Sequence, residues 1–111
     1  MSILVIAEHN NTELNPSTLH TVTAASQAGG DVTVLVAGHN AGDVAKEAAN
    51  VAGVSGVLHA DGAEYANGIA ENLVPLIVGL ADQYSHIFAP ATTYGKNIMP
   101  GVAALKDVAQ I

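Results

Sequence analysis

The sequence contains no cysteine and no arginine, and only three lysines stand against ten acidic residues. Without cysteine, neither a disulfide framework nor a thiolate metal site can form. Phosphate binding by counterion release needs clustered Lys or Arg, whereas Lys46, Lys96 and Lys106 are far apart in the sequence. Together with the net charge of -7, this spacing argues against nucleic acid and against an anionic membrane surface as partners.

Aromatic residues are also scarce, with one Phe and three Tyr, so a stacking platform for bases or for a flavin ring is not evident. No apolar run approaches the ~18 residues of a membrane span. The amino terminus lacks the basic region of a signal peptide. These features predict a soluble protein, cytoplasmic in a bacterium or located in the mitochondrial matrix of a eukaryote.

Short apolar runs alternate with segments of helical periodicity. Strands are predicted at residues 3–7, 32–38, 56–60 and 86–89, and the continuous β-branched run at residues 3–7 is typical of a strand covered on both faces. A first helix should begin near Pro16 and stop at Gly29 and Gly30, a second should span residues 41–52, and a third should contain or start near Pro75. The helical faces expected to be apolar are Leu19, Val22 and Ala25 or Ser26; then Val44, Ala48, Val51 and Ala52; then Ile69, Leu73, Leu76, Ile77, Leu80 and Ala81.

A fourth helix is predicted around Ile98, Val102 and Leu105, and residues 108–111 resemble the start of a fifth strand. This order of elements predicts one α/β domain over residues 1–111. It should have three layers, with a mostly parallel sheet and helices on both faces, in a Rossmann-like or adenine nucleotide alpha hydrolase-like topology. Ligands of such sheets bind beyond the carboxyl ends of the strands, at the switch point of strand order. Because the chain stops inside an apolar pattern, we expect a domain cut from a longer chain.

Four segments carry a resemblance to a known family. These are residues 3–9 (ILVIAEH), 19–25 (LHTVTAA), 34–38 (VLVAG) and, most specifically, 89–100 (APATTYGKNIMP) with the alanine-rich stretch that follows. In this order the segments resemble the amino-terminal domain of the alpha subunit of electron transfer flavoproteins, over nearly the whole chain. Two departures are Gly101, where many relatives carry a basic residue, and Lys106, which interrupts an apolar stretch.

The resemblance implies a scaffold and subunit-docking domain in a heterodimeric electron carrier. In that family the alpha subunit pairs with a beta subunit, and FAD rests mainly in the carboxyl-terminal domain of alpha. The full-length protein would carry electrons from dehydrogenases to a quinone reductase, without a catalytic site in this domain. No FAD-binding residue can be transferred to this chain, so we expect no cofactor to be bound by these 111 residues alone.

The loop before the fourth predicted helix holds the candidate binding residues. Thr92 and Thr93 offer hydroxyls, Gly95 allows close backbone approach, and Lys96 supplies charge near the start of a helix that attracts anions. The alternative is that Thr92 caps the helix and Lys96 forms an interdomain ion pair. If this loop binds an anion, a second functional hypothesis follows, in which the chain is a nucleotide-binding module resembling universal stress proteins.

Glu8 and His9 follow the first predicted strand and could perform acid–base chemistry in a small hydrolase. Adjacent strand residues point to opposite faces, which favours a polar loop in contact with a partner. No metal site is predicted, since the remaining histidines show no ligand spacing; they are His20, His39, His59 and His86. No nucleophile elbow, P-loop or dinucleotide-binding glycine motif is present.

Overall fold

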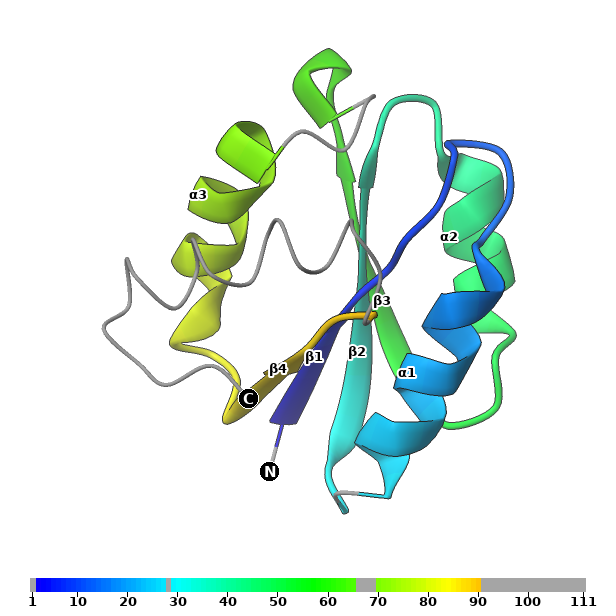
Figure 1. Ribbon diagram of the computed structural model, residues 1–111, viewed down its shortest axis with the longest axis vertical. Coiled ribbons are helices and arrows are strands. Elements are labelled where there is room, and N and C mark those ends of the chain that lie inside the picture. The colour runs from blue at the N-terminus through cyan, green and yellow to red at the C-terminus, as the bar shows by residue number, and fades with distance from the viewer. Residues whose placement is uncertain (1, 28, 66–69, 91–111) are drawn as a thin grey trace.

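The computed structural model describes residues 2–27, 29–65 and 70–90 (Figure 1). Its four strands form one parallel sheet in the order β3-β2-β1-β4. The elements in chain order are β1 (Ser2–Ile6), α1 (Pro16–Ser26), β2 (Asp31–Gly38), α2 (Gly42–Ala49), β3 (Val54–Asp61), the 3₁₀ helix η1 (Ala63–Tyr65), α3 (Ala70–Ala81) and β4 (His86–Phe88). The predicted α/β class and parallel sheet are confirmed.

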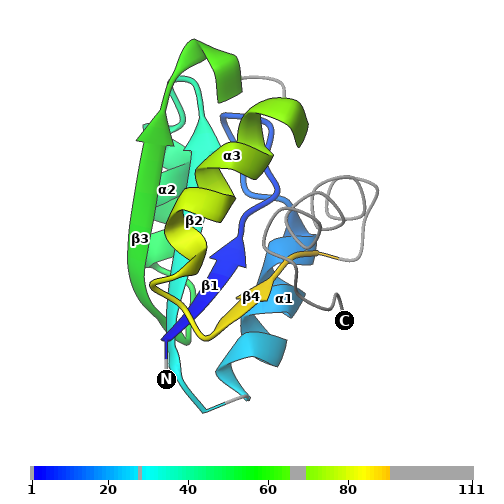
Figure 2. The same cartoon turned by 90° about the vertical axis from the view of Figure 1, so that its left-hand side faces the viewer.

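The positions of the helices follow from the handedness of the connections. The chain moves outward from β1 to β2 and β3, and then returns past β1 to place β4 on its other side. Because crossovers between parallel strands are right-handed, connections that run in opposite directions place their helices on opposite faces. Accordingly α1 and α2 cover one face of the sheet and α3 covers the other (Figures 1 and 2), which gives the predicted three layers.

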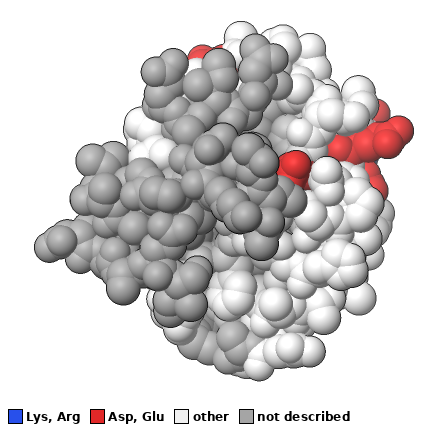
Figure 3. Space-filling view, in the orientation of Figure 1, with Lys and Arg blue, Asp and Glu red and all other residues white. Residues whose placement is uncertain are grey.

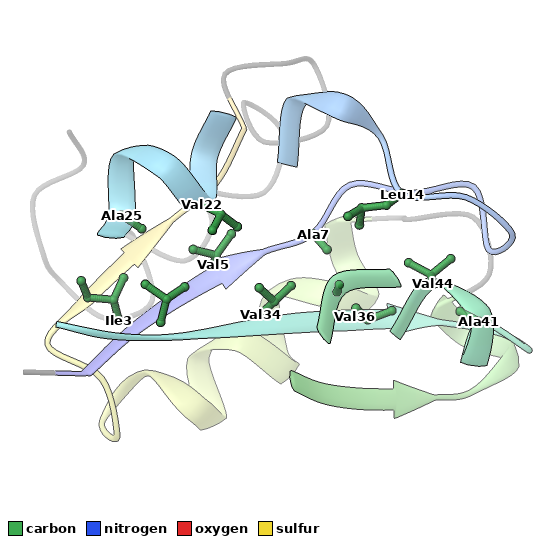
Figure 4. Close-up of a cluster of buried hydrophobic side chains, with 12 residues drawn as sticks. Ile3, Val5, Ala7, Leu14, Val22, Ala25, Val34, Val36, Ala41 and Val44 are labelled. Atoms are coloured by element: carbon green, nitrogen blue, oxygen red, sulfur yellow. The ribbon is translucent and has the colours of Figure 1, made fainter. Parts of the chain in front are cut away.

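Alternating side chains of the two central strands build two cores. Ile3 and Val5 of β1 pack toward α1 and α2 (Figure 4), whereas Leu4 and Ile6 pack toward α3. All four side chains are at most 1% exposed. A strand buried on both faces has no polar side, which explains the uninterrupted apolar runs of the sequence.

The predicted apolar face of α1 is partly wrong. Leu19 is 43% exposed and Ser26 is exposed, whereas Val22, Ala25 and Thr18 are buried. The helix is turned so that residues 18, 22 and 25 face the sheet, at i, i+4 and i+7 spacing. The Thr18 hydroxyl accepts a hydrogen bond from the Glu8 N–H at 2.9 Å and donates to the Glu8 carbonyl at 3.2 Å. This anchor fixes the rotation of α1. At the other end of the helix, Gly29 follows as predicted, with a φ of 89°.

Helix α2 and strand β3 differ from the predictions by more than one residue at a boundary. Helix α2 ends at Ala49 rather than at residue 52, because the chain tightens into i→i+3 hydrogen bonds from Asn50 to Glu47 and from Val51 to Ala48. Val51 is half-buried against the core, but Ala52 is exposed, contrary to the prediction. Strand β3 is longer than predicted because its pairing with β2 extends from Val54 to Asp61, with one register shift after Val54, and η1 was not predicted.

Helix α3 contains Pro75 in its interior, so the alternative in which the regular helix starts near that residue is wrong. Leu73 and Ile77 are completely buried, and Leu76 and Leu80 pack against the same core. Ile69, the fourth predicted helix and the fifth predicted strand lie outside the described residues. Within the described part of the chain, no helix has the length and apolar character that crossing a membrane requires.

Candidate functional site

The switch point of strand order lies between β1 and β4, because the connection from β1 runs outward to β2 whereas the connection from β3 returns past β1 to β4 on its other side. In this class of sheet, ligands bind beyond the carboxyl ends of the strands at such a point. Residues 8–15 leave β1 there, and Ala89 and Pro90 leave β4. The predicted binding residues Thr92, Thr93, Gly95 and Lys96 lie outside the described residues. The site can therefore be built from the loop after β1 and the helix start that follows it.

The first turn of α1 already has internal partners for its backbone donors. The side chain of Asn15 accepts a hydrogen bond from the Ser17 N–H at 2.9 Å, and the Asn15 carbonyl accepts from the Thr18 N–H at 2.9 Å. Pro16, at the first helical position, has no N–H to offer. An anion that approached this helix would have to displace the cap to gain a backbone hydrogen bond.

The carboxylate of Glu8 also lies at the start of α1. Its Oε1 atom accepts from the Ser17 hydroxyl at 3.3 Å, and its Oε2 atom is 3.5 Å from the Asn15 side-chain nitrogen. A negative charge near a helix amino terminus is favourable because it offsets the positive end of the helix dipole. Glu8 thus provides, from within the protein, the charge that a phosphate group would bring, and the start of α1 is poorly suited to nucleotides.

The side chain of His9 turns away from that of Glu8. Its Nε2 atom is 2.8 Å from the Ala37 carbonyl oxygen, and its Nδ1 atom is 3.0 Å from the Asn11 backbone nitrogen. A carbonyl only accepts and an N–H only donates, so the hydrogen must be on Nε2 and the lone pair on Nδ1. The two contacts hold His9 as the neutral Nε2–H tautomer. Glu8 and His9 have separate partners, so the arrangement does not support a shared acid–base role.

The loop around His9 closes onto the turn between β2 and α2. Asn11 has a φ of 74°, a left-handed conformation that Asn tolerates better than most residues. Its Oδ1 atom accepts from the His39 N–H at 2.9 Å. On the other side of the loop, the Glu47 carboxylate of α2 accepts from the Leu14 N–H at 3.0 Å. Sequence reasoning did not identify these partners, because each contact joins residues about 30 positions apart.

Burial lowers the pKa of His9 below its ordinary value of 6.5, the hydrogen bond to Ala37 opposes this change, and repulsion from His59 lowers the pKa further. His59 is near the end of β3, so the fold brings together two histidines whose spacing gave no sign of it. His20, His39, His59 and His86 are exposed. Among residues 2–27, 29–65 and 70–90, no group of His, Asp and Glu side chains could hold a metal ion.

The described residues do not fit FAD. The donors of the first turn of α1 are occupied, and the first turn of α2 carries Asp43, whose charge would repel a phosphate. The aromatic side chains of Tyr65, Tyr84 and Phe88 pack against the two cores and do not form a stacking surface.

In Figure 3 the visible carboxylate side chains gather mainly on the side where α2 lies in Figure 1. Asp43 and Glu47 of α2 are exposed, as is Glu13 in the neighbouring loop. Lys46 is the one basic side chain within the described residues. A field of this sign favours basic partner surfaces over phosphate-bearing ligands.

Comparison with known proteins identifies the family. Residues 3–111 match the model of the electron transfer flavoprotein domain. The chain is 60% identical over its whole length to an electron transfer flavoprotein subunit alpha of Pseudomonas aeruginosa, of which it covers 36%. It is 53% identical over 97% of its length to the subunit alpha of Paracoccus denitrificans, of which it covers 35%. It is 46% identical over 97% of its length to a mitochondrial subunit alpha of Dictyostelium discoideum, of which it covers 33%.

The chain thus spans about a third of the length of these curated relatives. The hypothesis of a module resembling universal stress proteins is not favoured, since the relatives are named as subunits of an electron carrier. The chain belongs to the electron transfer flavoprotein family, which confirms its resemblance to the amino-terminal domain of that family's alpha subunit.

Proposed function

We propose that residues 1–111 are a scaffold and docking domain of an FAD-containing electron carrier, without a catalytic site of their own. The family match and the names of the relatives support the role in electron transfer. The capped start of α1, with the Glu8 carboxylate beside it, supports a domain that leaves flavin binding to another part of the protein. This occupied helix start is the structural observation that carries the proposal.

The partners in this proposal are the beta subunit, the carboxyl-terminal FAD domain of the same protein, the dehydrogenases that donate electrons and the quinone reductase that accepts them. The acidic surface of the described residues supports docking onto basic surfaces rather than onto nucleic acid. The protein would work in the cytoplasm of a bacterium, or in the mitochondrial matrix of a eukaryote.

The proposal predicts that the purified chain is colourless and stays colourless after incubation with FAD and gel filtration. The expected result follows from the absence, among the described residues, of free first-turn donors on α1 and of an exposed aromatic platform. Absorbance at flavin wavelengths and quenching of FAD fluorescence would measure binding. A stoichiometric yellow complex would count against the assignment.

Docking can be tested separately by mixing the chain with purified beta subunit and following the mass of the complex by light scattering. If the chain binds neither the beta subunit nor a separately expressed carboxyl-terminal domain, the docking role is overturned and the family assignment stays intact. Measurements at low and high salt would test the electrostatic part, since attraction between an acidic surface and a basic one weakens as salt screens it.

A further inference from the structure

The contacts of His9 require one protonation state. The ring nitrogens lie between an acceptor, the Ala37 carbonyl, and a donor, the Asn11 N–H. If a proton is added to Nδ1, two hydrogens point at each other and the contact with Asn11 becomes repulsive. Neutral His9 therefore joins the loop to β2, and charged His9 cannot occupy the same position.

The other groups around the ring do not compensate for a positive charge. The Glu8 carboxylate contacts Ser17, the Glu47 carboxylate contacts the Leu14 N–H, and the Asp61 carboxylate of β3 accepts from the Asn40 N–H at 3.1 Å. Three further titratable side chains of the loop and its neighbouring elements are exposed; they are Glu13 in the loop, His39 in the turn after β2 and His59 on β3. His59 opposes a charge on His9.

Asn11 transmits the state of His9 to the turn after β2. Its N–H binds the ring of His9, and its side chain binds the His39 N–H. The close packing around Gly38 holds both partners in place, because a Cβ atom there would be 2.5 Å from the Asn11 Oδ1 atom and 2.7 Å from the His9 Cε1 atom. If the ring leaves, the hydrogen bonds of Asn11 with His9 and with His39 lose their geometry together.

We propose that residues 8–14 form a proton-sensitive latch at the switch point, closed on the turn between β2 and α2 while His9 is neutral and released when its Nδ1 atom binds a proton. This latch goes beyond the docking role proposed above. Release detaches Asn11 from His39 and Leu14 from Glu47, whereas Glu8 stays anchored to α1 through the Thr18 hydroxyl. The rest of the sheet does not depend on these contacts, since the Ala7 N–H binds the Leu35 carbonyl at 3.0 Å within the ladder.

The direction of the pH effect follows from proton linkage. The open loop binds a proton on His9 at pH ~6.5, the value of a free histidine, whereas the closed loop resists it. The latch is therefore fully stable above this pH and weakens as the pH falls through it. The fraction of open loop should rise about tenfold for each pH unit between the pKa of the open state and that of the closed state.

Nuclear magnetic resonance of the labelled chain can test the latch between pH 8 and pH 5. At pH 8 the ¹⁵N shifts of His9 should be those of the neutral Nε2–H tautomer. As the pH falls below about 6.5, the hydrogen-exchange protection of the Asn11, His39 and Leu14 amides, corrected for intrinsic exchange, should fall about tenfold per pH unit. The amide of Ala7 should stay protected. Equal loss at Ala7 would mean global unfolding and would overturn the latch.

Two variants separate His9 from its neighbour. In His9→Gln the side chain cannot titrate, so the protection of Asn11 should no longer depend on pH. In the matched control His59→Gln the onset near pH 6.5 should persist, and the step should end at a higher pH and be smaller, because removing the repulsion raises the pKa of His9 in the closed loop alone. A step of the same size in His9→Gln would contradict the proposal. If that variant does not fold, the test uses the wild-type chain. Protonation of His9 without loss of hydrogen-exchange protection at the Asn11 amide would overturn the latch.

Discussion

Replacing Leu4 by alanine should lower the free energy of unfolding by about 2–5 kcal/mol, the range for a large-to-small change in a packed core. Leu4 is completely buried on the central strand β1, within the cluster that joins the sheet to α3. Its neighbours Leu35 and Leu73 belong to different elements, so they cannot collapse into the cavity without moving the sheet or the helix. Urea denaturation followed by circular dichroism would measure the loss.

Leu19→Ala is the matched control for this experiment, because it removes the same atoms from a side chain that is 43% exposed. Its cost should stay within about 0.5 kcal/mol, as for most surface substitutions. Similar losses in the two variants would show that Leu19 is buried, as the helical periodicity alone suggested, and that the orientation of α1 described above is wrong.

Gly38→Ala should destabilise the protein by about 1–3 kcal/mol, the usual cost of adding atoms to a filled site. The new Cβ atom would be 2.5 Å from the Asn11 Oδ1 atom, 2.7 Å from the His9 Cε1 atom and 3.1 Å from the Ala41 Cβ atom. The Asn11 side chain can move away only by giving up the hydrogen bond from His39. Thermal unfolding and the exchange rate of the His39 amide would report the change.

Gly79→Ala is a control in which the free energy of unfolding should change in the opposite direction. Gly79 lies inside α3, and a Cβ atom there would meet nothing within 4 Å. Alanine should therefore stabilise this helix by about 0.5–1 kcal/mol, since glycine loses more backbone entropy when it folds. If Gly38→Ala raised the stability as Gly79→Ala does, the close approach of the loop to β2 would be refuted.

The fold was predictable because its signals are local. The uninterrupted apolar run at residues 3–7 indicates burial on both faces, and alternation with helical segments indicates parallel strands. Periodicity gives the spacing of apolar residues but not the rotation of the helix. The rotation of α1 is set by the hydrogen bonds of the Thr18 hydroxyl to Glu8, and this is why Leu19 was assigned to the wrong face.

The site was less predictable because its contacts are not local. Glu8 and His9 were identified as polar residues at the switch point, and their side chains have separate partners in the loop beyond β1. The ring of His9, however, binds a carbonyl 28 positions away, through a loop whose path depends on the left-handed turn at Asn11. The spacing of residues in the sequence does not predict the path of such a loop. The predicted contacts of Thr92, Thr93, Gly95 and Lys96 stay predictions.

The strand order also constrains how the chain is made. Among the described strands, β1 is synthesised first and is a central strand, and its partner on one side, β4, is synthesised last. The backbone N–H and the hydroxyl of Ser85 bind the Ser2 carbonyl across a separation of 83 residues. Until α3 emerges, Leu4 and Ile6 lack its cover, and until β4 emerges, β1 has an open edge. Such late, distant pairing slows folding and exposes the nascent chain to aggregation.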